Sequence, residues 1–288
     1  MVSLILAANM ATAPVSFRAM SFNIWVGGTQ SQPLEKTIEV LQFSKADIVG
    51  VQEPGPNLPK IAAGLKWNRS DDASIVTKFE IVEEWKVEGN RWGGAKLKLA
   101  DGSHVLVYND HFNPYPYGPY EVRDKKATTA AQAIAVEENA GRVDQMKRVL
   151  ANLAARPDRN LPVIFTGDFN TPSHLDWVRS TQERNFGLVV SWPVTRLAAE
   201  AGFKDGFRTV HSDPLRKPGF TWSPGYPVGK LEANDVMDRI DFVLFRGALR
   251  PKNAWVVGET GPVSDLAVDP WPSDHRAVAV EFEVEGSR

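Results

Sequence analysis

The segment Pro272-Ser273-Asp274-His275-Arg276 places a carboxylate beside an imidazole, directly before a strand-like alternation of apolar and polar residues. A carboxylate can bind a hard divalent cation, and an imidazole held by a second carboxylate can take a proton from water. One such pair is common in proteins and is weak by itself. Five further polar groups stand at the edges of apolar runs: Phe22-Asn23, Gln52-Glu53, Asn109-Asp110-His111, Gly167-Asp168-Phe169-Asn170 and Arg239-Ile240-Asp241. Together the six groups predict a metal-assisted phosphoester hydrolase.

Glu53 is the strongest candidate metal ligand, because the apolar run 48–51 before it would hold its backbone rigidly. Asn23 ends a comparable strand, and its amide oxygen could bind a hard cation or complete a turn. Asp274 would complete the metal site. The chain has no cysteine, which excludes thiolate nucleophiles, disulfides and cysteine-bound zinc. Oxygen ligands favour Mg²⁺ or Mn²⁺, with Ca²⁺ as a further option.

Asp168 and Asn170 follow the apolar run 161–166 and lie two residues apart. If the backbone stays extended, both side chains point the same way while Phe169 packs behind them. The alternative is an Asx-turn that begins a helix.

Two more strand ends carry an imidazole or a carboxylate. Asn109 and His111 are again two residues apart, and His111 is either a phosphate contact or general acid, or a hydrogen-bonded histidine at a strand end. Asp241 lies in a strongly apolar strand, where a buried carboxylate needs a partner. We expect that partner to be His275, whose tautomer Asp241 would fix, with Arg239 as the alternative.

The elements that must position these residues are short strands interrupted by helices. Apolar runs and alternation predict strands at 15–25, 47–53, 73–77, 80–87, 94–99, 104–110, 161–166, 239–245, 254–257 and 277–284. Helical spacing and capping residues predict helices at 33–46, 58–64, within 125–138, around 143–153, at 173–184 and at 194–201. Residues 112–124 read as a loop rich in Pro and Tyr. Two strand-rich halves, 15–110 and 161–284, predict an α/β (α+β) domain of two packed sheets with helices outside.

Composition limits the function classes further. The hydrophobic fraction of 43% and the charged fraction of 24% are ordinary for a globular protein, and the net charge is −2. This balance disfavours a general nucleic-acid binder, which carries a basic stripe. No apolar run is long enough to cross a bilayer. Residues 1–14 are either the remnant of an export signal or a disordered terminus before a single catalytic domain, 15–288. A signal would predict a secreted or periplasmic protein, and otherwise a cytoplasmic one; the sequence carries no signal of oligomeric state.

The ordered motifs resemble the endonuclease/exonuclease/phosphatase superfamily, which includes pancreatic-type deoxyribonucleases, sphingomyelinases and inositol-polyphosphate 5-phosphatases. The resemblance implies a four-layer α/β/β/α sandwich of two packed, mainly antiparallel sheets, with the site at one rim. It implies that Glu53 binds the metal with Asn23 and Asp274 nearby. It also implies further roles: His275 as general base oriented by Asp241, Asp168 and Asn170 as groups that position water and phosphate, and His111 as a contact to a phosphate oxygen or the leaving group.

Two departures bear on the substrate. The Pro/Tyr loop is longer and more aromatic than a minimal member needs. Some nuclease-like members support the histidine at position 111 with a carboxylate just before the neighbouring strand, whereas residues 90–94 carry none.

These features favour a phosphodiesterase acting on a small or lipid-like phosphoester by in-line attack of water. Its predicted substrate-binding residues are Asn109, Tyr115, Tyr117 and Trp222. The alternatives are a nuclease, for which no Lys/Arg cluster is evident, and an inactive binding module of the same fold.

Overall fold

The computed structural model describes residues 15–225, 228–231 and 234–285. Residues 1–14, on which the export-signal hypothesis rests, lie outside this part of the chain. Over the described residues, no helix has the length and apolar character needed to cross a membrane.

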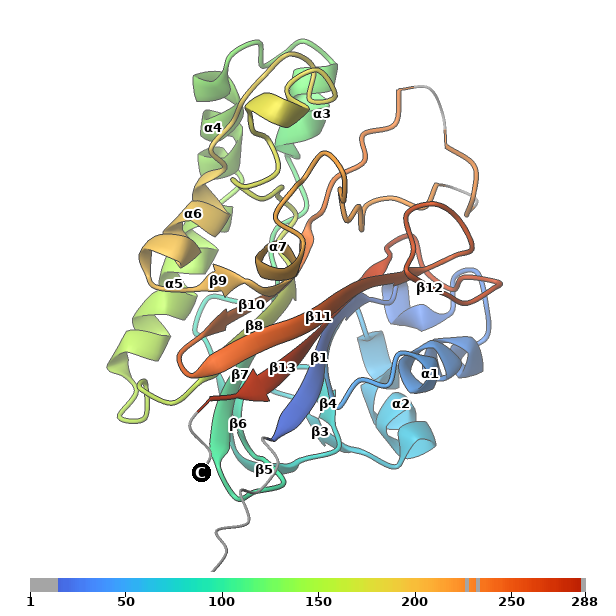
Figure 1. Ribbon diagram of the computed structural model, residues 1–288, viewed down its shortest axis with the longest axis vertical. Helices are drawn as coiled ribbons and strands as arrows, with labels where there is room; N and C mark the ends of the chain where they lie inside the picture. Colours follow the sequence, from blue (N-terminus) through green and yellow to red (C-terminus); the bar gives the residue numbers. More distant parts are fainter. Residues whose placement is uncertain (1–14, 226–227, 232–233, 286–288) are drawn as a thin grey trace, which may run out of the picture.

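Two sheets form the centre of the fold (Figure 1). The seven-stranded sheet has the order β12 (Leu266–Ala267), β11 (Leu249–Gly258), β13 (Ala277–Val284), β1 (Ser16–Asn23), β2 (Ile48–Gln52), β4 (Ile75–Thr77) and β3 (Asn68–Ser70). The six-stranded sheet has the order β5 (Glu80–Lys86), β6 (Gly93–Lys98), β7 (His104–His111), β8 (Val163–Asp168), β10 (Asp241–Arg246) and β9 (Lys204–Asp205). Most neighbouring strands are antiparallel; the parallel pairs are β1 with β2, β7 with β8, and β11 with β12.

Helices cover the outer faces of both sheets. The seven-stranded sheet packs against α1 (Leu34–Phe43) and α2 (Leu58–Leu65), and the six-stranded sheet packs against α5 (Arg142–Ala155) and α6 (Pro193–Glu200). A third apolar cluster, which includes Ile48, Val278, Val105, Ile164 and Val243, fills the space between the sheets. The result is the predicted four-layer α/β/β/α sandwich. The remaining helices are α3 (Gly118–Arg123), α4 (Ala130–Asn139) and α7 (Gly206–Val210).

The strand registers bring distant polar residues to one edge of the sandwich. In the seven-stranded sheet, Asn23 at the end of β1 is paired with Gln52, the residue before Glu53. In the six-stranded sheet, Asp168 is paired with His111 on one side and with Asp241 on the other. Because parallel strands end on the same side of a sheet, the ends of β1, β2, β7 and β8 supply one common site.

A buried polar contact joins the two sheets beneath this edge and accounts for Asn109. The Asn109 carbonyl accepts from Gln52 Nε2 at 2.6 Å and from Thr166 Oγ1 at 3.1 Å, while its amide donates to the Ala73 and Ser74 carbonyls. A side chain at Gly50 would collide with Asn109 and Thr166, so only glycine fits there. Asn109 is 1% exposed and does not line the cleft. The prediction that Asn109 binds substrate is therefore replaced by a structural role.

Two predicted elements differ from the observed ones. The predicted helix at 173–184 is a series of turns with one short 3-10 segment, Arg179–Thr181, because the Asp176 carboxylate pairs with Arg208 and Arg239 instead of capping a helix. The segment 112–124, predicted as a loop, contains the short helix α3.

Candidate active site

A cleft of about 210 Å³ opens at the edge where these strands end. Its floor is polar and its walls are largely aromatic. The lining residues are Glu53, His111, Pro114, Tyr115, Tyr117, Tyr120, Asp168, Asn170, Trp222, Ile240, Asp274 and His275. The structure thus brings together nine residues predicted for catalysis, metal binding or substrate binding, from segments far apart in the sequence, with Asn23 and Asp241 buried directly behind them.

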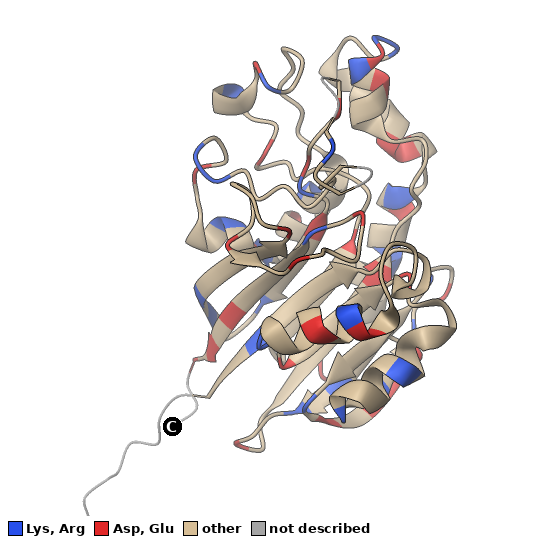
Figure 2. Cartoon of the chain, turned by 90° about the vertical axis from the view of Figure 1, so that its right-hand side faces the viewer, with Lys and Arg blue, Asp and Glu red and all other residues tan. Residues whose placement is uncertain are grey.

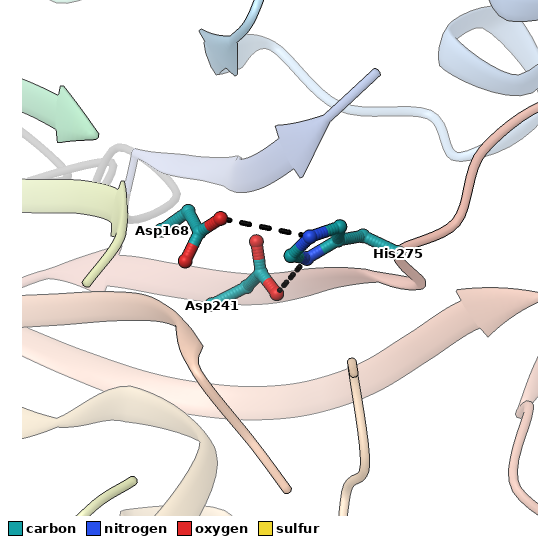
Figure 3. Close-up of side chains that lie close together, drawn as sticks. All are labelled: Asp168, Asp241 and His275. Carbon is teal, nitrogen blue, oxygen red and sulfur yellow. Dashed lines mark hydrogen bonds and ion pairs between the residues drawn. The ribbon is translucent and has the colours of Figure 1, made fainter. Parts of the chain in front are cut away.

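His275 lies between two buried carboxylates (Figure 3). Its Nδ1 is 3.0 Å from Asp241 Oδ2, and its Nε2 is 3.7 Å from Asp168 Oδ2. The predicted contact between Asp241 and His275 is therefore present, and Arg239 pairs instead with Asp176 and Asp205. Burial disfavours the imidazolium, but the charges of Asp241 and Asp168 outweigh this effect and raise the pKa of His275 to about 10. In the cation-free site the ring is therefore protonated at neutral pH, and a divalent cation beside these carboxylates would offset their charge and lower the pKa of His275.

Glu53 and Asp274 provide the oxygen atoms that a divalent cation would require. Asp274 is largely buried, and its Oδ1 has no hydrogen-bond partner among the described residues. Burial raises the pKa of Asp274, and the neighbouring carboxylates of Glu53 and Asp168 raise it further. A cluster of carboxylates with an unsatisfied oxygen fits a hard cation, since Mg²⁺ and Mn²⁺ prefer such ligands and would neutralise their mutual repulsion.

Asn23 is oriented differently from the prediction. Its Oδ1 accepts a hydrogen bond from the Trp25 backbone N–H at 3.0 Å, so that Nδ2 points into the acidic site. Nδ2 donates to Asp168 Oδ2 at 2.9 Å and to Glu53 Oε1 at 3.3 Å. An amide nitrogen that donates to carboxylates is not a cation ligand. The structure therefore assigns Asn23 to holding Glu53 and Asp168 in place, and not to the metal.

A second group of side chains also carries atoms of the kind that bind metals. The ligand atoms of Asp168, Asp241 and His275 lie within 4.8 Å of one another. In this group the Nδ1 of His275 already shares a proton with Asp241 Oδ2, which leaves the other imidazole nitrogen, Asp168 and Asp241 Oδ1 for other ligands. The group therefore suits proton transfer better than it suits holding a cation.

Left-handed backbone conformations occur at two residues of the cleft, Glu53 and Asn170, and in the turn at Trp25 and Val26. Trp25, Val26, Glu53 and Asn170 have φ values of 56°, 42°, 57° and 49°. Such values are costly for residues other than glycine, and for a β-branched valine above all. The strain is compensated where Val26 N–H donates to Glu53 Oε2 at 2.8 Å, which fixes the carboxylate. At Asn170 the turn replaces the extended backbone that the sequence predicted, although Asp168 and Asn170 still share the cleft.

Sequence reasoning missed the residues that surround His111. His111 Nε2 faces Asp168 Oδ2 at 3.5 Å and Glu53 Oε1 at 3.9 Å, on the cleft side. On its other side, Arg91 NH1 lies 3.2 Å from Nδ1, and the Trp92 ring stacks on the imidazole with centroids 6.5 Å apart. Burial lowers the pKa of His111, and Arg91 adds to this effect against Asp168 and Glu53. The signal available in the sequence was Arg91-Trp92, a cation beside an aromatic ring directly before the strand that pairs with the His111 strand.

The aromatic wall divides the predicted substrate contacts into two kinds. Tyr115 is 70% exposed at the cleft mouth, and Trp222 packs 4.8 Å from the His275 ring. Tyr117 offers only its ring, because its hydroxyl donates to Asp238 Oδ2 at 2.8 Å. The indole of Trp222 donates to the Tyr120 hydroxyl at 2.9 Å, which makes these two residues a fixed pair. A second cavity of about 330 Å³ shares Tyr120, Trp222 and Asp274 with the cleft.

Comparison with known proteins agrees with this geometry. Residues 20–275 match the family model described as "Endonuclease/Exonuclease/phosphatase family". The chain is also similar to a Caenorhabditis elegans protein named "Uncharacterized protein F14F9.5", with 27% identity over 286 residues, 92% of this chain and 90% of that protein.

Solved structures share the fold at low sequence identity. A truncated Caenorhabditis elegans TDP2 has a TM-score of 0.57 and 20% identity over 93% of this chain and 98% of that one. An endonuclease/exonuclease/phosphatase family protein from Bacteroides thetaiotaomicron has a TM-score of 0.58 and 17% identity, covering 96% and 98% of the two chains. D. rerio TDP2 complexed with a single-strand DNA product has a TM-score of 0.57 and 16% identity, covering 93% and 98%.

Proposed function

Because the chain belongs to the endonuclease/exonuclease/phosphatase family of metal-dependent phosphoester hydrolases, we propose that its cleft hydrolyses a phosphodiester by attack of a water molecule. Breaking such a bond requires neutralisation of the phosphate charge, activation of water and alignment of the attacking and leaving oxygens. The cleft contains residues suited to each task.

His275 is the proposed general base. Asp241 holds its Nδ1, and Nε2 lies on the cleft side, where it would accept a proton from water once a bound cation has lowered the pKa of the ring. Asp168, which faces both His275 and His111, would orient that water, and Asn170 would contact a phosphoryl oxygen. His111 would donate a hydrogen bond from Nε2 to a phosphoryl or leaving-group oxygen.

Glu53 and Asp274 are the proposed holders of one divalent cation, Mg²⁺ or Mn²⁺ before Ca²⁺. When bound, such an ion polarises phosphoryl oxygens and lowers the pKa of coordinated water. The unpartnered, buried Oδ1 of Asp274 supports this assignment most directly. The acidity of the floor supports it too: none of the described residues that line the cleft is Lys or Arg, so a phosphate could not approach three carboxylates without a cation.

The main support for a diester substrate over a monoester is that two cavities meet at Asp274. The fixed Trp222–Tyr120 pair lies on the boundary between them. A phosphodiester has two substituents and could place one on each side, whereas a monoester has one. The aromatic walls suit a sugar, a base or a lipid headgroup.

The test is hydrolysis of bis-p-nitrophenyl phosphate, compared with the monoester p-nitrophenyl phosphate, by chelator-treated protein supplied with Mg²⁺, Mn²⁺ or Ca²⁺. We expect diesterase activity that depends on the ion and is lost in Glu53→Ala and His275→Ala. The matched controls are Glu138→Ala, on the exposed face of α4, and His104→Ala, at the opposite end of β7 from His111. Full activity in excess chelator would exclude the metal role, and inactivity of the folded, metal-supplied protein on many phosphoesters would favour the non-catalytic alternative.

One comparison favours nucleic acid as a second candidate substrate, since D. rerio TDP2 has the same fold and was crystallised with a single-strand DNA product. Basic and acidic residues are interspersed along the helices and loops drawn in Figure 2, whereas a general nucleic-acid binder carries its basic residues in a stripe. Nicking of plasmid DNA that weakens steeply with salt would favour this candidate; indifference to DNA at low salt, alongside diesterase activity, would exclude it.

A further inference from the structure

We propose that Arg91 is a positioning residue that fixes the tautomer of His111, so that the imidazole donates from Nε2 into the cleft. The catalytic consequence rests on the proposed function, whereas the tautomer itself does not. The proposal starts from the contact between Arg91 NH1 and His111 Nδ1, 3.2 Å apart.

The chemistry of the two groups determines which one donates and which one accepts in this contact. A guanidinium has five N–H donors, no acceptor, and does not lose its proton in proteins. An imidazole nitrogen at hydrogen-bond distance from it must therefore be the acceptor, without a hydrogen. In neutral His111 the proton is then on Nε2, which faces Asp168 at 3.5 Å and Glu53 at 3.9 Å.

The opposite arrangement would give the opposite tautomer. A carboxylate at the same place accepts a proton from Nδ1 and leaves Nε2 as an acceptor in the neutral ring. Arg91 thus makes His111 a neutral hydrogen-bond donor toward a phosphoryl oxygen or a leaving oxygen, whereas a carboxylate would raise the pKa of the ring and favour the imidazolium.

The turn that carries Arg91 is anchored to the strand that carries His111. The buried Asp110 carboxylate accepts from Asn90 Nδ2 at 2.6 Å and from the backbone N–H groups of Arg91 and Trp92. Arg148 on α5 holds the other side of Asn90, with Nε 2.7 Å from Oδ1. Trp92 stacks on the His111 ring, with centroids 6.5 Å apart. Because these contacts hold the turn independently of the exposed Arg91 side chain, substitutions at Arg91 should leave it folded.

The first test identifies the tautomer of His111 by a spectroscopic measurement that does not require catalytic activity. Long-range ¹H–¹⁵N correlation spectra of the full-length, metal-free protein distinguish protonated from unprotonated ring nitrogens, and His111→Gln assigns the signals. We expect a proton on Nε2 and none on Nδ1 in the wild type, a mixture in Arg91→Ala, and a proton on Nδ1 in Arg91→Glu. Arg216→Ala, which removes an exposed arginine paired with Asp213, should leave the His111 signals unchanged. A proton on Nδ1 of the wild-type ring, or the same tautomer in Arg91→Glu as in the wild type, would overturn the proposal.

The second test measures how the tautomer of His111 affects the hydrolysis of bis-p-nitrophenyl phosphate. Residues that orient a catalytic side chain typically change activity by about 10- to 100-fold, and we expect a loss of this size in Arg91→Ala, mainly in kcat. His111→Gln carries an amide that has no tautomers, so adding Arg91→Ala to it should cause no further loss. Equal losses from Arg91→Ala in both backgrounds would mean that Arg91 acts independently of His111. If the protein hydrolyses no phosphodiester, the proposed function fails while the spectra still decide the tautomer.

Discussion

At the scale of single residues, the cleft depends on which atom of each polar side chain faces inward. Asn23 turns its amide nitrogen toward Glu53 and Asp168 because a backbone N–H occupies its oxygen. Asp241 occupies one imidazole nitrogen of His275 and leaves the other for the substrate side. The same residue types in other orientations would not form a proton acceptor beside a cation site.

Asp241→Asn is the sharpest residue-scale test of this arrangement. An amide of the same shape carries no charge, so the pKa of His275 should fall and its orientation should loosen. Because general-base catalysis contributes about 10²- to 10⁴-fold, we expect kcat on bis-p-nitrophenyl phosphate to fall within that range. Asp144→Asn, an exposed carboxylate on α5, is the control and should keep full activity. A kcat of Asp241→Asn close to that of the wild type would contradict the proposed base.

At the scale of elements, buried charges attach the Pro/Tyr loop to the sandwich. Arg142 at the start of α5 pairs with Glu137 at 2.6 Å, both side chains being fully buried. The same guanidinium donates to the carbonyls of Asn113 and Pro116 at 2.8 and 2.7 Å. One side chain therefore fixes the path of the loop that places Tyr115 at the cleft mouth.

Removing this guanidinium should affect both stability and substrate binding. Arg142→Met leaves the buried Glu137 without its charged partner, and breaking a buried pair in this way typically costs about 3–5 kcal/mol. We expect a loss of that size in urea unfolding, and a raised KM because the loop is released. Lys147→Met, on the exposed face of the same helix, is the control. A stable Arg142→Met protein with unchanged KM would show that the loop is held by other contacts.

Asp238 makes the stability of the fold depend on pH. It is buried where three loops meet and accepts from Tyr117 and from the Trp177 indole, both at 2.8 Å. Burial raises the pKa of Asp238 to about 6, from an ordinary value of 3.8. The folded protein therefore binds this proton more tightly than the unfolded chain does, so the contribution of Asp238 to the free energy of unfolding is largest below pH 4. That contribution should fall by up to about 3 kcal/mol as the pH rises to 6 and stay constant above it.

Asp238→Asn cannot ionise and should lose this pH dependence. Urea unfolding of both proteins between pH 4 and pH 8 measures it. The stability of the variant relative to the wild type should rise from pH 4 to pH 6, on top of a constant offset from the altered hydrogen bonds. A difference that is the same at every pH would contradict the assigned ionisation.

At the scale of the whole molecule, the two sheets form a rigid frame that gathers strand ends at one rim. We propose that residues 15–288 act as one catalytic domain, because the cleft takes residues from both sheets and the core between them is continuous. The repulsion among the carboxylates of the floor therefore lowers the free energy of unfolding of the whole domain, and a bound cation would remove this repulsion.

Metal binding should therefore stabilise the whole protein. A ligand bound only by the folded state adds about 2.7 kcal/mol at a concentration of 100 times Kd. We expect Mg²⁺ or Mn²⁺ to raise the Tm of the chelator-treated wild type, and to raise it much less in Glu53→Gln and Asp274→Asn. If the Tm rises equally in these two variants but not in Asp168→Asn, the cation binds instead to the group of Asp168, Asp241 and His275.

The sequence by itself determined the fold class and most of the cleft. The strands are short apolar runs whose periodicity is local, and polar residues that interrupt such runs at their ends must lie at the rim of a sheet. Glu53, Asp168, Asp241 and His275 could be identified in this way without any knowledge of how the strands pair.

Only the tertiary structure decided the orientation of groups and the neighbours that fix them. Asn109 looks like a site residue in sequence but faces the opposite sheet, since its role depends on Gly50 and Gln52 from another strand. The helix predicted from Ser173 and Asp176 does not form, because distant arginines bind Asp176. Arg91 reaches His111 across a hairpin. Hydrogen-bond direction and ion pairing depend on groups far apart in the chain, whereas hydrophobic periodicity depends only on neighbours.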